Sequence, residues 1–287
     1  MDQKIILCIV MTLLGSISKS QSQVFCYYAS WAVYRPGDGK FDVDNIDPFL
    51  CTQVSFAYIG VNSNGSLQVV DPHQANSNGL DGLNRFASLK EINPDLQLFI
   101  SIGGFSESPE EYSNVLANSS LRGTLIDSAV AFLDEYGLDG IDFDWDYPTR
   151  NDASNDQDKL LLKDLQETFK PKGYLISAAV NAGPRFLNDS YDIAQLNGFL
   201  DFINVITFDY HGHFNTYVGH SSPLFNSSLD ADSGGTDLNV NFMSSKVTFR
   251  GIDKEDKSGR FSLYKVQADD TDSGASSPHS IPEDHSF

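Results

Sequence analysis

Short apolar runs, rich in β-branched and aromatic residues, recur along the chain and are separated by longer segments with helical spacing. Six runs are predicted to be strands: Val24–Ser30, Gln53–Val61, Leu96–Gly104, Leu138–Asp146, Tyr174–Val180 and Phe202–Asp209. Three segments between them place apolar residues at helical intervals: 80–93, 118–137 and 155–173. Asn118 or Ser119 suits the start of the second helix, and Gly137 suits its end. The alternation of strand and helix predicts a parallel sheet and an α/β fold.

The fourth predicted strand carries an unusual row of acids. In the stretch IDFDWDYP, aspartates stand at every second position, at Asp142, Asp144 and Asp146. Side chains alternate between the faces of a strand, so these three share one face. In a parallel barrel the functional groups lie at the carboxyl ends of the strands, and we expect the aspartates to face the interior.

Crowded carboxylates repel one another when all are ionised, so at least one is expected to hold a proton near neutral pH. Such an arrangement suits proton transfer. A calcium loop would need a glycine-containing turn and a distal glutamate, which this strand lacks. A solvated strand face would not explain why Ile141, Phe143 and Trp145 alternate with the acids.

The composition limits the partners. The 287 residues carry a formal net charge of −20, which argues against nucleic acid or an anionic membrane surface as a partner. Hydrophobic residues make up 40% of the chain, which is enough to bury the core of one large domain or two small ones.

The N-terminus indicates secretion. Ile5 to Leu14 form an apolar run that is too short to span a bilayer, and the small residues of Ser18-Lys19-Ser20 resemble a signal-peptidase site. We predict a signal peptide over residues 1–20 and an extracellular protein; a buried N-terminal strand is the alternative. Four sequons are compatible with secretion and glycosylation: Asn64, Asn118, Asn188 and Asn226.

The cysteines lead to a related prediction. Cys8 lies in the presumed signal peptide, which leaves Cys26 and Cys51 as an even pair in an oxidising compartment. We predict one disulfide between them, with two unpaired buried thiols as the alternative. No third or fourth ligand at zinc spacing accompanies the pair.

The segment LDGIDFDWDYP resembles the signature of glycoside hydrolase family 18, the chitinases and chitinase-like lectins. The resemblance runs from about Val24 to Asn241 and continues, in the family's order, through CYYASWAVYRPGDGKFDVDNIDPFLCTQVSFAYIGV, LFISIGGFS, LISAAVNAG and VITFDYHGHFNTYVGHSSPLF. It implies a TIM (β/α)8-type barrel, here incomplete with about six recognisable βα units. It also implies binding of chitin or N-acetylglucosamine oligosaccharides, with neither cofactor nor metal.

The family cleaves β-1,4 bonds between N-acetylglucosamine units by substrate assistance, in which the substrate's acetamido oxygen attacks the anomeric carbon. By resemblance, Asp146 stands at the general-acid position, Asp144 orients the acetamido group and Asp142 shares a proton with Asp144. Asp139 is a structural member of the motif. The resemblance also implies a set of substrate-contacting positions: Tyr27, Phe105, Trp145, Phe208 and Asp209. Packing in the core is the alternative role for the aromatic ones.

Three positions depart from the family. Asp146 replaces a glutamate and is one methylene shorter, so its proton is expected to stop short of the leaving oxygen. Phe105 replaces a tryptophan, and Phe208 replaces a tyrosine whose hydroxyl stabilises the intermediate. We therefore expect a chitinase-like protein that binds sugar with weak or absent hydrolysis. The alternatives are an active chitinase and a shortened isoform that does not fold.

The C-terminal part departs further. The partial barrel is expected over residues 21–242, where DLNVNF resembles the start of the helix after strand six, and a divergent acidic tail over 243–287, whose last twenty residues suggest disorder. KVTFRGI and RFSLYKV could form strands, joined by a linker that suits a hairpin. Three histidines cluster near strand six, and loop or core roles are expected for them rather than a metal site: His211, His213 and His220. The sequence does not indicate an oligomeric state.

Overall fold

A curled parallel sheet organises the chain. The computed structural model describes residues 23–104, 109–144, 155–181, 196, 198–213, 215–228, 230, 237–249 and 261–264. The parallel strands neighbour one another in the order β1 (Phe25–Ala29), β2 (Gln53–Val61), β4 (Gln97–Gly103), β5 (Gly140–Asp144), β6 (Leu175–Asn181), β7 (Phe202–Ile206) and β8 (Phe261–Tyr264). The short β3 (Leu67–Val69) pairs with β2 in the antiparallel direction. All six predicted strands are confirmed, and the fold is an incomplete TIM-type barrel.

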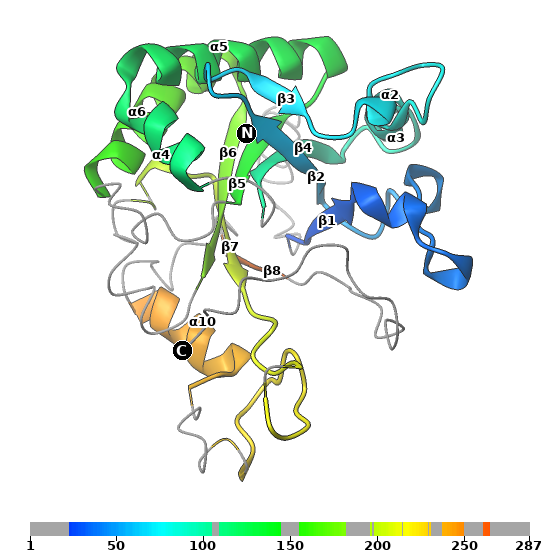
Figure 1. The fold of residues 1–287 in the computed structure, drawn as a ribbon, viewed down its shortest axis with the longest axis vertical. Helices are drawn as coiled ribbons and strands as arrows, with labels where there is room; N and C mark the ends of the chain where they lie inside the picture. The colour runs from blue at the N-terminus through cyan, green and yellow to red at the C-terminus, as the bar shows by residue number, and fades with distance from the viewer. Residues whose placement is uncertain are drawn as a thin grey trace, which may run out of the picture.

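The helices lie outside this sheet. α4 (Pro109–Ala117), α5 (Ser119–Tyr136) and α6 (Asn155–Phe169) lie together on one side, as Figure 1 shows. α2 (Gly82–Ala87) and α3 (Leu89–Ile92) lie on the other side of the view, and Phe86 of α2 packs against Phe56 of β2 with ring centroids 5.5 Å apart. α10 (Val240–Phe249) lies at the opposite end of the view. Short 3-10 turns complete the loops: η1 (Ser30–Tyr34), η2 (Gly37–Gly39), η3 (Val43–Asn45), η4 (Pro72–Gln74) and η5 (Lys170–Lys172).

The ends of α5 follow the predicted signals. Asn118 is the N-cap, and its side-chain oxygen accepts from the backbone N–H of Ser120 at 2.9 Å. Gly137 ends the helix in the left-handed region at φ 65°, which a glycine adopts without steric cost. Leu125 and Leu133 bury the inner stripe of the helix against the sheet, so packing and capping specify the same segment.

The bottom of the barrel interior is filled by aromatic rings. Phe25 of β1, Phe99 of β4 and Phe202 of β7 form a separate buried cluster, with ring centroids 5.1 Å apart for Phe25 and Phe99. Gly140 of β5 leaves room for them, because a Cβ there would lie 2.6 Å from the ring of Phe99. The interior is thus a packed core below the layer that carries the polar groups.

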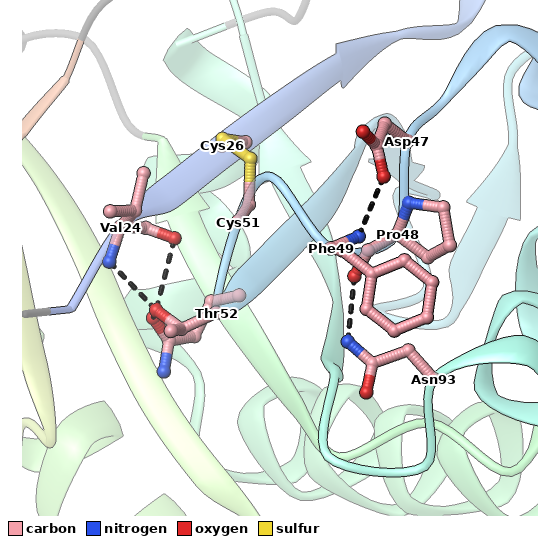
Figure 2. Close-up of a disulfide and its surroundings, with 9 residues drawn as sticks. Val24, Cys26, Asp47, Pro48, Phe49, Cys51, Thr52 and Asn93 are labelled. Atoms are coloured by element: carbon pink, nitrogen blue, oxygen red, sulfur yellow. Dashed lines mark hydrogen bonds between the residues drawn. A yellow bond between two sulfur atoms is a disulfide. The ribbon is translucent and has the colours of Figure 1, made fainter. Parts of the chain in front are cut away.

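A disulfide joins Cys26 of β1 to Cys51, which precedes β2, as predicted (Figure 2). Thr52 ties the same two segments together, since its hydroxyl oxygen accepts from the backbone N–H of Val24 at 2.7 Å. Both links fix the amino ends of the first two strands, away from the carboxyl ends where the aspartates lie.

The expected hairpin near the C-terminus is wrong. KVTFRGI was expected to form a strand, but the residues from Val240 to Phe249 form α10, and β8 pairs with β7 in the parallel direction. The helix begins directly after Asn239, whose side-chain oxygen accepts from the backbone N–H of Phe242 at 2.9 Å and so caps the first turn. Once this first turn is nucleated, each further residue adds a backbone hydrogen bond, which outweighs the strand preference of a short β-branched run.

The helix therefore crosses from β7 to a seventh parallel strand. DLNVNF does begin this helix, as expected. α10 spans the boundary at residues 242 and 243, and β8 lies beyond it. β8 also contacts β1, so the two ends of the curled sheet approach each other. The last twenty residues lie outside the described ranges.

Candidate functional site

Asp142 lies at the centre of a buried hydrogen-bond network inside the barrel. Its carboxylate, fully shielded from solvent, accepts from side chains of four other strands. The donors are the hydroxyls of Tyr27 at 2.8 Å, Ser101 at 2.9 Å and Ser177 at 2.6 Å, and the amide of Asn204 at 3.0 Å. The side chain therefore points into the interior, and Ile141 and Phe143 lie on the other face, as the alternation predicts.

Strand register explains why these donors converge. Ser101, Asp142 and Ser177 are direct partners across β4, β5 and β6. Asn204 on β7 also donates to the hydroxyl of Tyr27 at 2.8 Å, which links the last donor to the first. One layer of the barrel thus surrounds a single carboxyl group with donors.

Burial raises the pKa of Asp142 above its ordinary value, and the four hydrogen bonds act in the opposite direction. A raised pKa was expected for at least one of the acids. The expected cause was repulsion between carboxylates, whereas the largest cause at Asp142 is removal from water. A carboxyl group with a raised pKa keeps its proton to a higher pH than an ordinary aspartate does.

Asp144 lies one layer higher, at the end of β5, and is 5% exposed. Its carboxylate accepts from the hydroxyl of Tyr58 on β2 at 2.7 Å. The ring of Tyr58 stacks on the indole of Trp31, with centroids 5.6 Å apart and planes inclined by 15°. Trp31 is 44% exposed, so a stacked aromatic pair leads from the surface to this carboxylate.

Asp139 lies at the opposite end of β5 and has a structural role. Its carboxylate accepts from the backbone N–H of Leu98 at 2.7 Å and forms an ion pair with Lys90 of α3 at 2.7 Å. Its own N–H donates to the carbonyl of Leu98 at 2.8 Å. These contacts fix the start of β5 against β4 and thereby set the height of the aspartates above it.

Two of the other predicted site residues follow β7, and three lie outside the described residues. Phe208 follows β7 and is half-buried, and Asp209 is exposed with a left-handed backbone at φ 58°. The N–H of Asp209 donates to the hydroxyl of Ser221 at 3.1 Å. Three predicted site residues lie outside the described residues: Phe105, Trp145 and Asp146. Of the sequons, Asn188 also lies outside, whereas three asparagines are exposed: Asn64, Asn118 and Asn226.

Sequence reasoning missed five residues of this site: Trp31, Tyr58, Ser101, Ser177 and Asn204. A signal was present for the last three. Each is a polar residue with apolar neighbours on both sides along its strand, at the alternate position that faces the interior. Trp31 and Tyr58 carry no such signal, because an aromatic residue within a strand or next to one is usually part of the core.

His211 belongs to the histidine cluster for which a loop or core role is expected. Its side chain is buried and lies 3.3 Å from the carboxylate of Asp230, which is buried as well. No cluster of three or more metal-binding side chains occurs within the described ranges. In the same part of the chain, no helix combines the length and the apolar character needed to cross a membrane.

Comparison with known proteins shows which family this chain resembles. The sequence model of the family described as Glycosyl hydrolases family 18 matches residues 23–258. Probable chitinase 2 of Drosophila melanogaster is 35% identical over 207 residues, which make up 70% of this chain and 43% of that protein. Endochitinase of Manduca sexta is 33% identical over 217 residues, 72% of this chain and 39% of that protein. The chain therefore spans less than half the length of these relatives.

Solved structures of other proteins have a similar fold. A Group IV chitinase of Ostrinia furnacalis, solved in complex with allosamidin, has a TM-score of 0.77 and 37% identity, covering 85% of this chain and 65% of that one. Human YKL-39, described as a pseudo-chitinase with retained chitooligosaccharide binding properties, has a TM-score of 0.74 and 28% identity over 84% of this chain and 65% of that one. A chitinase in complex with allosamidin and a pseudo-chitinase thus share this architecture.

Proposed function

The chain belongs to glycosyl hydrolase family 18, and from that premise we propose that it is a secreted chitinase-like protein that binds chitin or N-acetylglucosamine oligosaccharides with impaired catalysis. The observation that carries the proposal is the stacked pair Trp31 and Tyr58 above the carboxylate of Asp144. The apolar face of a sugar ring can stack on an exposed aromatic side chain, and a carboxylate beside it can hold a polar substituent.

Each acid has a distinct role in this proposal. Asp144 accepts a hydrogen bond from the acetamido N–H of the bound sugar and orients that group. Asp142, whose pKa is raised by burial, supplies the proton that the two acids share. Asp209 contributes hydrogen bonds to the sugar. Tyr27 contributes its ring, since its hydroxyl donates to Asp142 and accepts from Asn204, and Phe105, Trp145 and Phe208 contribute apolar surface.

Impaired catalysis follows from the residue types. Asp146 must protonate the leaving oxygen with a side chain one methylene shorter than glutamate, and a misplacement on the order of 1 Å can cost about a hundredfold in rate. Phe208 has no hydroxyl with which to stabilise charge on the intermediate, a loss that can reach a few kcal/mol. Neither change removes a surface for binding the sugar.

The experiment is thermal unfolding of the secreted protein with and without tetra-N-acetylchitotetraose, followed by an assay for its cleavage. We expect a cooperative transition whose midpoint rises with the tetrasaccharide, since a ligand that binds only the folded state stabilises it. We also expect little cleavage, and a gain on Asp146→Glu. Ordinary cleavage by the unaltered protein would establish the alternative, an active chitinase. A midpoint that no concentration of the tetrasaccharide moves would rule out the binding function.

A further inference from the structure

Tyr58 occupies a constrained position between the surface and the acids. It lies within β2, its ring stacks on Trp31, and its hydroxyl donates to the Oδ2 of Asp144 at 2.7 Å. The ring also lies against the backbone of Gly104, where a Cβ would come within 2.6 Å of a ring carbon. No bulkier residue at that position would leave the ring where it is.

The backbone of Asp144 is held by the same segment. The N–H of Gly104 donates to the carbonyl of Asp144 at 2.8 Å. At Gly103, a Cβ would lie 2.2 Å from that carbonyl oxygen, so only glycine permits the approach. Asp144 is thus fixed through its main chain by the end of β4 and through its carboxylate by Tyr58 of β2.

We propose that Tyr58 is a positioning residue whose hydroxyl fixes the carboxylate of Asp144 so that the site distinguishes N-acetylated from deacetylated sugar. The inference rests on the proposed sugar binding. The acetamido group is the substituent that Asp144 would hold, and a carboxylate kept in one orientation loses less freedom on binding it. The ring of Tyr58 has the separate task of supporting Trp31, whose face contacts the sugar whether or not it is acetylated.

Tyr58→Phe separates the two tasks, because it removes the hydroxyl and keeps the ring. We expect the affinity for tetra-N-acetylchitotetraose to fall about tenfold, the scale of one hydrogen bond to a charged group. The affinity for the deacetylated glucosamine tetramer should change less than about twofold. The ratio of the two association constants, measured by calorimetry at fixed salt, therefore falls about tenfold.

Two further variants serve as controls. Trp31→Ala removes the stacking surface and should weaken both tetramers alike, which leaves the ratio unchanged. Tyr174→Phe removes another hydroxyl that donates to an aspartate, Asp134, at the opposite end of the barrel. That variant should leave both affinities and their ratio unchanged.

A double-variant cycle with Asp144→Asn tests whether Tyr58 affects sugar binding through Asp144. If Tyr58 acts through Asp144, the ratio in the double variant should equal that of Asp144→Asn alone. Additive losses would overturn the inference, as would equal weakening of both tetramers or a Tyr58→Phe protein without cooperative unfolding. If the unaltered protein binds neither tetramer, the proposed function itself fails; if it binds and Tyr58→Phe changes nothing, only this inference fails.

Discussion

Two opposing effects act on the pKa of the Asp142 side chain. Burial favours its protonated form, whereas four donors favour its ionised form, and burial has the larger effect on its pKa. In the unfolded chain the group titrates near 3.8. Because the folded-state pKa lies above that value, the contribution of Asp142 to stability is fully present below about pH 4 and is lost as the pH rises through the folded-state pKa.

Asp142→Asn should remove this pH dependence. We expect the midpoint of the unaltered protein, relative to that of the variant, to rise as the pH falls from 7 to about 4. The difference between the two proteins is the quantity to measure by calorimetry, since other carboxylates affect both midpoints equally. A difference that stays constant over this range would show that Asp142 keeps the same charge in the folded and unfolded states.

The sequence predicted the direction in which Asp142 and Asp144 point, because alternation along a strand is a local property. It could not predict Ser101, Ser177 and Asn204 as partners of Asp142. Those contacts depend on the register of four strands, which is set by packing between residues far apart in the chain. Trp31 was missed for a similar reason, since only the folded structure brings η1 over the end of β2.

At the scale of elements, substitution of the N-cap of α5 tests how much a local capping signal stabilises the protein. Asn118 is exposed and its side-chain oxygen caps two backbone N–H groups, those of Ser120 and Leu121. Asn118→Ala should lower the free energy of unfolding by about 1 kcal/mol, as measured by denaturant titration. Asn118→Asp is the matched control, because aspartate caps equally well and its charge favours the helix N-terminus.

Both substitutions also abolish the sequon at Asn118, so a comparison between them excludes any contribution from a glycan. Equal stability of the alanine and aspartate variants would contradict a capping role. The capped start and glycine end of α5 were predicted from sequence, because both signals act within one turn. For α10 only the start was predicted, from the resemblance of DLNVNF, since the helix continues from Val240 to Phe249 through residues whose own preference is for a strand.

At the scale of the whole molecule, β8 is the last strand of the curled sheet and lies between β7 and β1. β8 pairs with β7 in register, Asn204 beside Ser262, and contacts β1 at the other end of the sheet. It thereby covers the edge of the strand that supplies Asn204 to the Asp142 network. An uncovered edge would expose unpaired backbone groups, which favours aggregation.

We therefore expect the chain shortened after Phe249, which lacks β8, to unfold about 5–10 °C lower than the full chain, given the cost of uncovering a few apolar side chains and a sheet edge. It should also bind tetra-N-acetylchitotetraose more weakly, because Asn204 is no longer held from both sides. A chain shortened after Gln267 keeps β8 and loses only the last twenty residues, so its midpoint should match that of the full chain. If both shortened chains matched the full chain, β8 would contribute nothing to stability, and β1 to β7 alone would suffice to hold the acids in place.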